Sequence, residues 1–113
     1  MQSRGYTANL GDDPDAIESY KAYHADAWPE VLEHSRRIGV GKARIFLLGR
    51  RLFMYMETTD DFQIPDASRP PEDAPPRVQE WQLLMASYLE RVPEDGPESI
   101  WAEMELIHTA GDD

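Results

Sequence analysis

The sequence contains no cysteine. The chain therefore forms no disulfide bond and has no thiolate to act as nucleophile or metal ligand. It also lacks an apolar N-terminal segment of the secretory type, and no run approaches 18 apolar residues. We expect a soluble cytoplasmic protein with no membrane partner.

Basic residues are scarce. The chain has 11 lysines and arginines against 22 aspartates and glutamates, which gives a net charge of −11. Such a field repels nucleic acids, anionic membranes and phosphorylated substrates. The acidic surface is consistent with a simple solubility device, and it also favours a neutral or cationic ligand. Nucleic acid is not an expected partner.

Common cofactor and metal motifs are missing as well. The sequence has no glycine-rich phosphate loop, no dinucleotide-binding fingerprint and no G-x-S-x-G elbow. His34 and His108 lack the spacing of paired metal ligands, and no carboxylate cluster completes a set. We expect neither a metal ion nor another cofactor.

Length and composition indicate a single globular domain over residues 1–113. The chain is 41% hydrophobic and 10% aromatic, without an internal repeat or a linker. At this size it can bury a modest core.

The first half of the chain predicts a strand and then an interrupted helix. Residues 4–10 are typical of a short strand. Asp13 is suited to cap a helix that starts at Pro14, because proline lacks the N–H that stays unsatisfied there. Pro29 should kink or break this helix at the residues that directly precede it. The helix is then expected to end at the glycines that follow, Gly39 and Gly41.

Two apolar runs and a proline-rich segment follow. Ala43–Leu48 and Leu52–Glu57 flank a glycine turn and predict a β-hairpin. Residues 60–76 are expected to form a long loop, because five of the nine prolines gather in it. The segment Pro65–Pro76 of this loop is a candidate lid over a pocket, because long loops in compact domains often bind ligands.

The remaining elements complete a known order. A second amphipathic helix is expected over residues 78–89, a turn at residues 93–97 and a last strand over residues 100–108. The order β-α-β-β-α-β is the ferredoxin-like α+β arrangement, an antiparallel sheet with two helices on one face. An apolar uncovered face would favour face-to-face dimerisation, so we expect a homodimer with barrel-like association.

A histidine and aromatic residues share one stripe of the first helix. His24 lies one turn after Tyr20 and one turn before Trp28. From spacing alone, a buried core histidine and a general acid/base are both open interpretations. The large flat faces of Trp28 and Trp81 suit the C–H patches of a sugar, although most tryptophans are simply core.

These residues also resemble a known family. The pattern Tyr20-x-x-x-His24-x-x-x-Trp28–Pro29–Glu30 is similar to the signature of the L-rhamnose mutarotase family and its L-fucose-type relatives. Weaker matches follow in order over nearly the whole chain, at Asp12–Asp13–Pro14, Ile45–Phe46–Leu47, Arg51–Leu52–Phe53–Met54, Val78–Gln79–Glu80–Trp81 and Leu84–Met85. The dimeric ferredoxin-like fold of that family agrees with the order of elements.

The resemblance implies an isomerase, an aldose mutarotase that interconverts the α and β anomers of a 6-deoxy-L-sugar without a cofactor. It implies that His24 is the catalytic acid/base, that Tyr20 assists or positions it, and that Trp81 packs on the sugar. Trp28 is expected to support the substrate site.

Two departures from the rhamnose-type pattern bear on the substrate. Gln82 stands where that pattern has a second tryptophan, and Ala43 stands near the place of a tyrosine. Both departures favour the L-fucose-type branch over the L-rhamnose type.

Two other classes of function share the expected topology. In a non-catalytic sugar-binding module, His24 would only hydrogen-bond a hydroxyl group. A small dimeric α+β oxygenase would need an apolar pocket and aromatic substrates.

Overall fold

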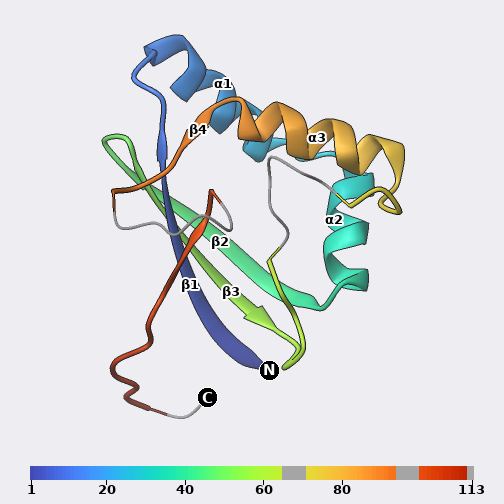
Figure 1. Ribbon diagram of the computed structural model, residues 1–113, viewed down its shortest axis with the longest axis vertical. Coiled ribbons are helices and arrows are strands. Elements are labelled where there is room, and N and C mark those ends of the chain that lie inside the picture. The colour runs from blue at the N-terminus through green and yellow to red at the C-terminus, as the bar shows by residue number, and fades with distance from the viewer. Residues whose placement is uncertain (65–70, 94–99, 112–113) are drawn as a thin grey trace.

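The computed structural model describes residues 1–64, 71–93 and 100–111. Across these ranges three helices lie on one face of a curled antiparallel sheet (Figure 1). The elements in chain order are β1 (Gln2–Leu10), α1 (Pro14–Ala25), α2 (Pro29–Arg37), β2 (Val40–Leu48), β3 (Arg51–Thr58), α3 (Pro76–Ala86), β4 (Leu89–Glu90) and β5 (Ala102–Met104). The expected ferredoxin-like α+β fold is confirmed.

The predicted break in the first helix is present and produces two helices. Asp13 caps α1, and its Oδ1 accepts the backbone N–H of Asp15 at 3.0 Å. α1 ends at Ala25, and Pro29 then begins α2, where its missing N–H costs nothing. The described chain therefore has one helix more than the two expected.

Only one of the two glycines expected to end this helical region does so. Gly39 follows α2 with a φ of +113°, a conformation that disfavours residues with a side chain. Gly41 instead lies inside β2.

The hairpin forms as predicted and is slightly longer. β2 and β3 pair in antiparallel register, with Leu48 opposite Arg51. Gly49 and Arg50 make the two-residue turn, and Gly49 takes a φ of +62°. A glycine at the first position of such a turn is the type II′ pattern, which matches the twist of the strands.

The strands lie in the order β2-β3-β1-β4, and β5 also pairs with β1. Glu90 of β4 pairs with Asn9, and Ala102 of β5 pairs with Thr7. These partners are two residues apart on β1, although eleven residues of chain lie between Glu90 and Ala102. β4 and β5 thus follow one another along the same edge of β1.

The last strand is shorter than the alternating pattern of residues 100–108 predicted. It spans only Ala102–Met104. Leu106 would continue the face of Met104, which none of the helices in the described ranges covers, and Leu106 is exposed. Because the single chain leaves much of Met104 and Leu106 exposed, the apolar alternation gains little free energy there.

The second predicted helix is shifted toward the N-terminus, because Pro76 is suited to its first position. Residues 60–64 and 71–75, which flank part of the expected proline-rich loop, form neither helix nor strand. Residues 65–70 of the candidate lid, and residues 94–97 of the expected turn, lie outside the described residues.

Candidate active site

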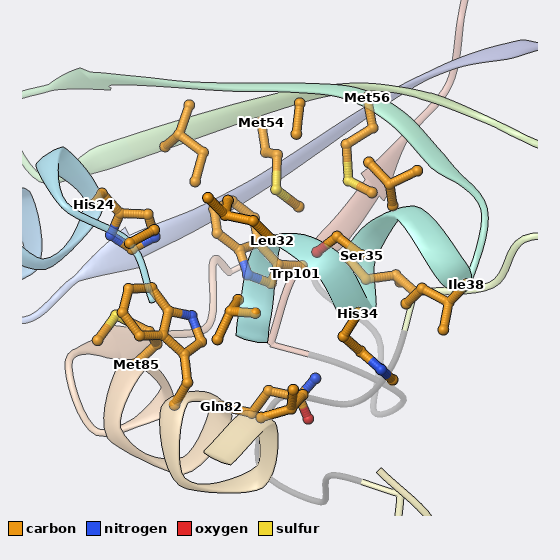
Figure 2. A pocket seen from close by; sticks show the side chains of 18 of the residues that line it. His24, Leu32, His34, Ser35, Ile38, Met54, Met56, Gln82, Met85 and Trp101 are labelled. Carbon is orange, nitrogen blue, oxygen red and sulfur yellow. The ribbon is translucent and has the colours of Figure 1, made fainter. Parts of the chain in front are cut away.

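A cavity of about 250 Å³ lies between the sheet and the helices α2 and α3. Figure 2 shows Met54 and Met56 reaching into it from β3, opposite Gln82 and Met85 of α3. This volume is at the small end for ligand pockets, which typically measure ~300–1,000 Å³. The wall is formed by apolar side chains together with four polar ones, His24, His34, Ser35 and Gln82.

His24 is held in one tautomer at an end of this cavity. Its Nδ1 lies 2.9 Å from the backbone oxygen of Tyr20. A carbonyl oxygen only accepts hydrogen bonds, so Nδ1 carries the proton and Nε2 has the free lone pair. Burial lowers the pKa of His24 below its ordinary value of 6.5, although the bond to the Tyr20 carbonyl opposes this shift. The imidazole is therefore neutral at pH 7.

Tyr20 packs directly against this imidazole. The two ring centroids are 4.3 Å apart, and Tyr20 is only 4% exposed. Burial raises the pKa of its phenol well above the ordinary value of 10.0, so the hydroxyl keeps its proton at neutral pH. Tyr20 is absent from the wall of the main cavity and lines a second hollow of about 270 Å³, to which His24 also contributes.

The two predicted tryptophans take different places. Trp81 lines the main cavity and meets the His24 ring edge to face, with centroids 5.4 Å apart. Trp28 does not line the cavity but packs on Trp81 at 5.1 Å. Arg77 covers Trp28, its guanidinium carbon 3.8 Å from the ring centroid, and also pairs with Glu30 of α2 at 3.2 Å. The fold thus brings His24, Tyr20 and Trp81 together, with Trp28 behind Trp81.

Sequence reasoning did not predict that three polar residues line the cavity, although it noted Gln82 as a departure from the rhamnose-type pattern. His34 and Ser35 from α2, and Gln82 from α3, face the cavity with His24. Helical spacing places Gln82 beside Trp81, but no local signal shows that α2 closes over the same space. Trp101 is buried and also lines the cavity.

Within residues 1–64, 71–93 and 100–111, no three side chains of the His, Asp or Glu type gather as metal ligands. No helix in the described part of the chain has the length and apolar character needed to cross a membrane.

Comparison with known proteins identifies the family. The model of the L-rhamnose mutarotase family matches residues 5–110. The chain belongs to the L-rhamnose mutarotase family. It is also 34% identical to a UPF0734 protein of Dictyostelium discoideum over 110 residues, which cover 95% of this chain and 88% of that protein. The identity to an L-fucose mutarotase of Xanthomonas campestris is 32% over 105 residues, or 91% of this chain and 83% of that protein.

Family membership confirms the resemblance found in the sequence. The chain is a sugar mutarotase, an isomerase that interconverts the α and β anomers of its substrate. This result does not favour the sugar-binding module or the oxygenase.

Solved structures agree on the fold of this mutarotase. An L-rhamnose mutarotase from Formosa agariphila superposes with a TM-score of 0.70 at 18% identity, covering 98% of this chain and all of that one. A tetracenomycin F2 cyclase from Streptomyces glaucescens gives 0.68 at 19% identity, with both chains fully covered. At these identities the likeness concerns the fold alone, which evidently supports more than one chemistry.

Proposed function

We propose that this mutarotase acts on a 6-deoxy-L-sugar, with L-fucose preferred over L-rhamnose. The 32% identity to a protein named L-fucose mutarotase supports this preference. Gln82 and Ala43, which replace aromatic residues of the rhamnose-type pattern, line the cavity and support it further. A small cavity with a mostly apolar wall suits one neutral sugar ring that carries a methyl group. The cytoplasm stays the predicted location.

The reaction needs one proton removed and one proton delivered. A base takes the proton of the anomeric hydroxyl, a carbonyl forms at C1, and the bond from C1 to the ring oxygen breaks as that oxygen is protonated. The open aldehyde turns about its C1–C2 bond, and the reverse steps close the other anomer. Protons, bonds and electrons balance without a cofactor.

His24 is the residue proposed for both proton transfers. The main support is its neutral imidazole, held by Tyr20 with Nε2 unprotonated, in a cavity wall beside Trp81. The anomeric and ring oxygens share one carbon, so a single imidazole can take a proton from one and return it to the other. Acid/base help of this kind typically contributes ~10²–10⁴-fold.

Tyr20 and the two tryptophans are proposed to support this chemistry. The backbone carbonyl of Tyr20 fixes the tautomer of His24, and the ring of Tyr20 limits the movement of the imidazole. Trp81 offers a flat face to the C–H patch of the sugar, while Trp28 holds Trp81 from behind.

Exchange NMR between the anomers of L-fucose, L-rhamnose and D-ribose tests this function. Wild-type protein should accelerate exchange most for L-fucose, and His24→Ala should lose ~10²–10⁴-fold of the enzymatic rate. His108→Ala, on the exposed C-terminal segment, is the matched control and should keep the full rate. A variant His24→Ala that remains as fast as wild type would exclude the proposed role, and no acceleration of any sugar would exclude the activity.

We also propose a homodimer formed through the open face of the sheet. Phe46 and Phe53 stack there with centroids 6.1 Å apart, and they are 56% and 37% exposed. Met104 of β5, which is 47% exposed and pairs with Gly5 of β1, adds to this apolar surface. A contiguous apolar surface of this kind is typical of an interface between copies.

A further inference from the structure

Gln82 carries a buried hydrogen-bond acceptor to which no described residue donates. Its Oε1 is shielded from solvent and has no hydrogen-bond partner within the described part of the chain. The residue lies on α3 directly after Trp81 and contributes to the cavity wall (Figure 2). Buried side-chain oxygens are nearly always paired, because an unpaired one loses its hydration without replacement.

A second glutamine on the same helix shows what a structural role looks like. The Nε2 of Gln79 donates to the backbone oxygens of Ala74 at 2.7 Å and Glu72 at 3.1 Å. Gln79 therefore ties α3 to the preceding loop and does not line the cavity. The Oε1 atom of Gln82 forms no such bond to any described residue, so folding alone does not account for an amide at this position.

We propose that Oε1 of Gln82 accepts a hydrogen bond from one hydroxyl group of the bound sugar and makes this residue a determinant of epimer specificity. An amide oxygen needs an O–H or N–H donor, and a neutral sugar offers O–H groups at fixed positions around its ring. The inference rests on the proposed function, since it places that substrate in the cavity.

The position of Gln82 explains why one acceptor can select among epimers. His24 and Trp81 contact the same cavity and fix where the reacting carbon and one sugar face must lie. A hydroxyl then reaches Gln82 in only one of its two configurations. The wrong epimer leaves the buried Oε1 of Gln82 without a hydrogen bond. Sites that pair with a substrate hydroxyl discriminate strongly against sugars that lack it, for this reason.

The test compares a variant that lacks the Gln82 acceptor with deoxy sugars that lack the hydroxyl donor. Gln82→Met has similar length and no amide, and it should fold at least as stably as wild type because a buried unpaired group is removed. We expect its kcat/KM for L-fucose to fall about tenfold, the size that corresponds to ~1.4 kcal/mol. Wild type should lose a similar factor for one of the 2-, 3- and 4-deoxy derivatives of L-fucose. Gln82→Met should lose little more with that derivative, because the variant and the deoxy sugar remove the same bond.

Gln79→Met is the matched control on the same helix. It should lower the melting temperature, because it breaks the bonds to Glu72 and Ala74, and leave the ranking of sugars unchanged. Gln82→Leu repeats the measurement should Gln82→Met fold poorly. Equal kcat/KM for wild type and both Gln82 variants, or losses that simply add with every deoxy sugar, would overturn the proposal. Wild-type protein inactive on all sugars would instead refute the proposed function itself.

Discussion

Two neighbouring residues of β3 show how differently the two faces of this sheet are used. Met54 points into the cavity under the helices and is 9% exposed, whereas Phe53 lies on the open face and is 37% exposed. The covered face combines flexible methionines with empty volume. The open face instead stacks rigid aromatic rings against solvent. Strand alternation thus gives β3 one side that lines the cavity and one side that carries the proposed dimer surface.

The difference extends to polar groups. On the open face, Glu57 is paired with Lys42 at 3.4 Å and accepts a hydrogen bond from Tyr55 at 2.8 Å. On the cavity side, Oε1 of Gln82 has no hydrogen-bond partner among the described residues, and Nε2 of His24 carries the free lone pair of the neutral ring. A face whose polar groups pair with one another favours packing, whereas a face with unpaired groups favours binding.

The largest effect should come from truncating the two neighbours in turn. Met54→Ala removes core packing and should lower the free energy of unfolding by ~2–5 kcal/mol. The value should lie toward the lower end of this range, because the Met54 side chain already borders empty space. Phe53→Ala should cost the isolated chain ~0.5–1.5 kcal/mol through the lost ring stack, and it should dissociate the proposed dimer. Urea unfolding and light scattering over a range of concentrations measure both quantities.

A control variant and two contradicting outcomes complete this test. Thr7→Ala lies on the same face and keeps both phenylalanines, so it should remain a dimer and serves as the control. If Phe53→Ala and wild type have the same mass at every concentration, the open face is not the interface. If Met54→Ala is as stable as wild type, the covered face is not the main core.

The next largest effect should be a pH dependence of stability that differs between the two faces of the sheet. Burial lowers the pKa of His24 in the folded protein, so the unfolded chain binds a proton more readily. The stability from neutral His24 is therefore fully present above pH 6.5 and is lost as the pH falls toward the lowered pKa. Activity should fall over the same acidic range, below pH 6.5, because protonated Nε2 is no longer a base.

Glu57 provides the comparison on the open face. The Tyr55 hydroxyl holds its pKa below the ordinary value of 4.5, so its contribution is present above pH 4.5 and lost at lower pH. Unfolding measured from pH 3 to pH 8 should show both transitions in wild type. The variant His24→Gln should abolish only the upper one. An upper transition that survives in this variant belongs to another group.

Much of the fold and of the candidate site could be predicted from the sequence, and there is a physical reason why the rest could not. Caps, proline positions and a glycine turn are local signals, and they correctly gave the break before Pro29 and the hairpin at Gly49. The pairing of His24 with Tyr20 and the nearness of Trp81 agree with the residues selected by the family signature. Which helix closes the cavity depends on tertiary packing, so His34 and Ser35 had no local signal. The last strand was overestimated because alternation alone does not show whether a face is covered.

The smallest effect should come from Arg77, which links α2 to α3 at the outer side of the tryptophan pair. Its guanidinium lies on Trp28 and pairs with Glu30 and with Glu80 at 3.1 Å, in positions that are about half exposed. Exposed ion pairs contribute little, and a cation on an exposed ring adds ~0.5–1 kcal/mol, so Arg77→Ala should cost ~1 kcal/mol. Because Trp28 supports Trp81, the variant should also raise KM a few-fold and leave kcat nearly unchanged.

The reason for the KM effect is positional. Arg77→Ala frees Trp28, and Trp81 then holds the sugar less firmly, whereas the bond from His24 to the Tyr20 carbonyl stays intact. Arg37→Ala is the matched control, because among the described residues Arg37 forms its ion pair within α2, with Glu33 at 2.6 Å. It should cost ~0.3–0.5 kcal/mol and leave KM unchanged. A fall in kcat with constant KM in Arg77→Ala would mean that this stack acts on the imidazole rather than on the sugar-binding face.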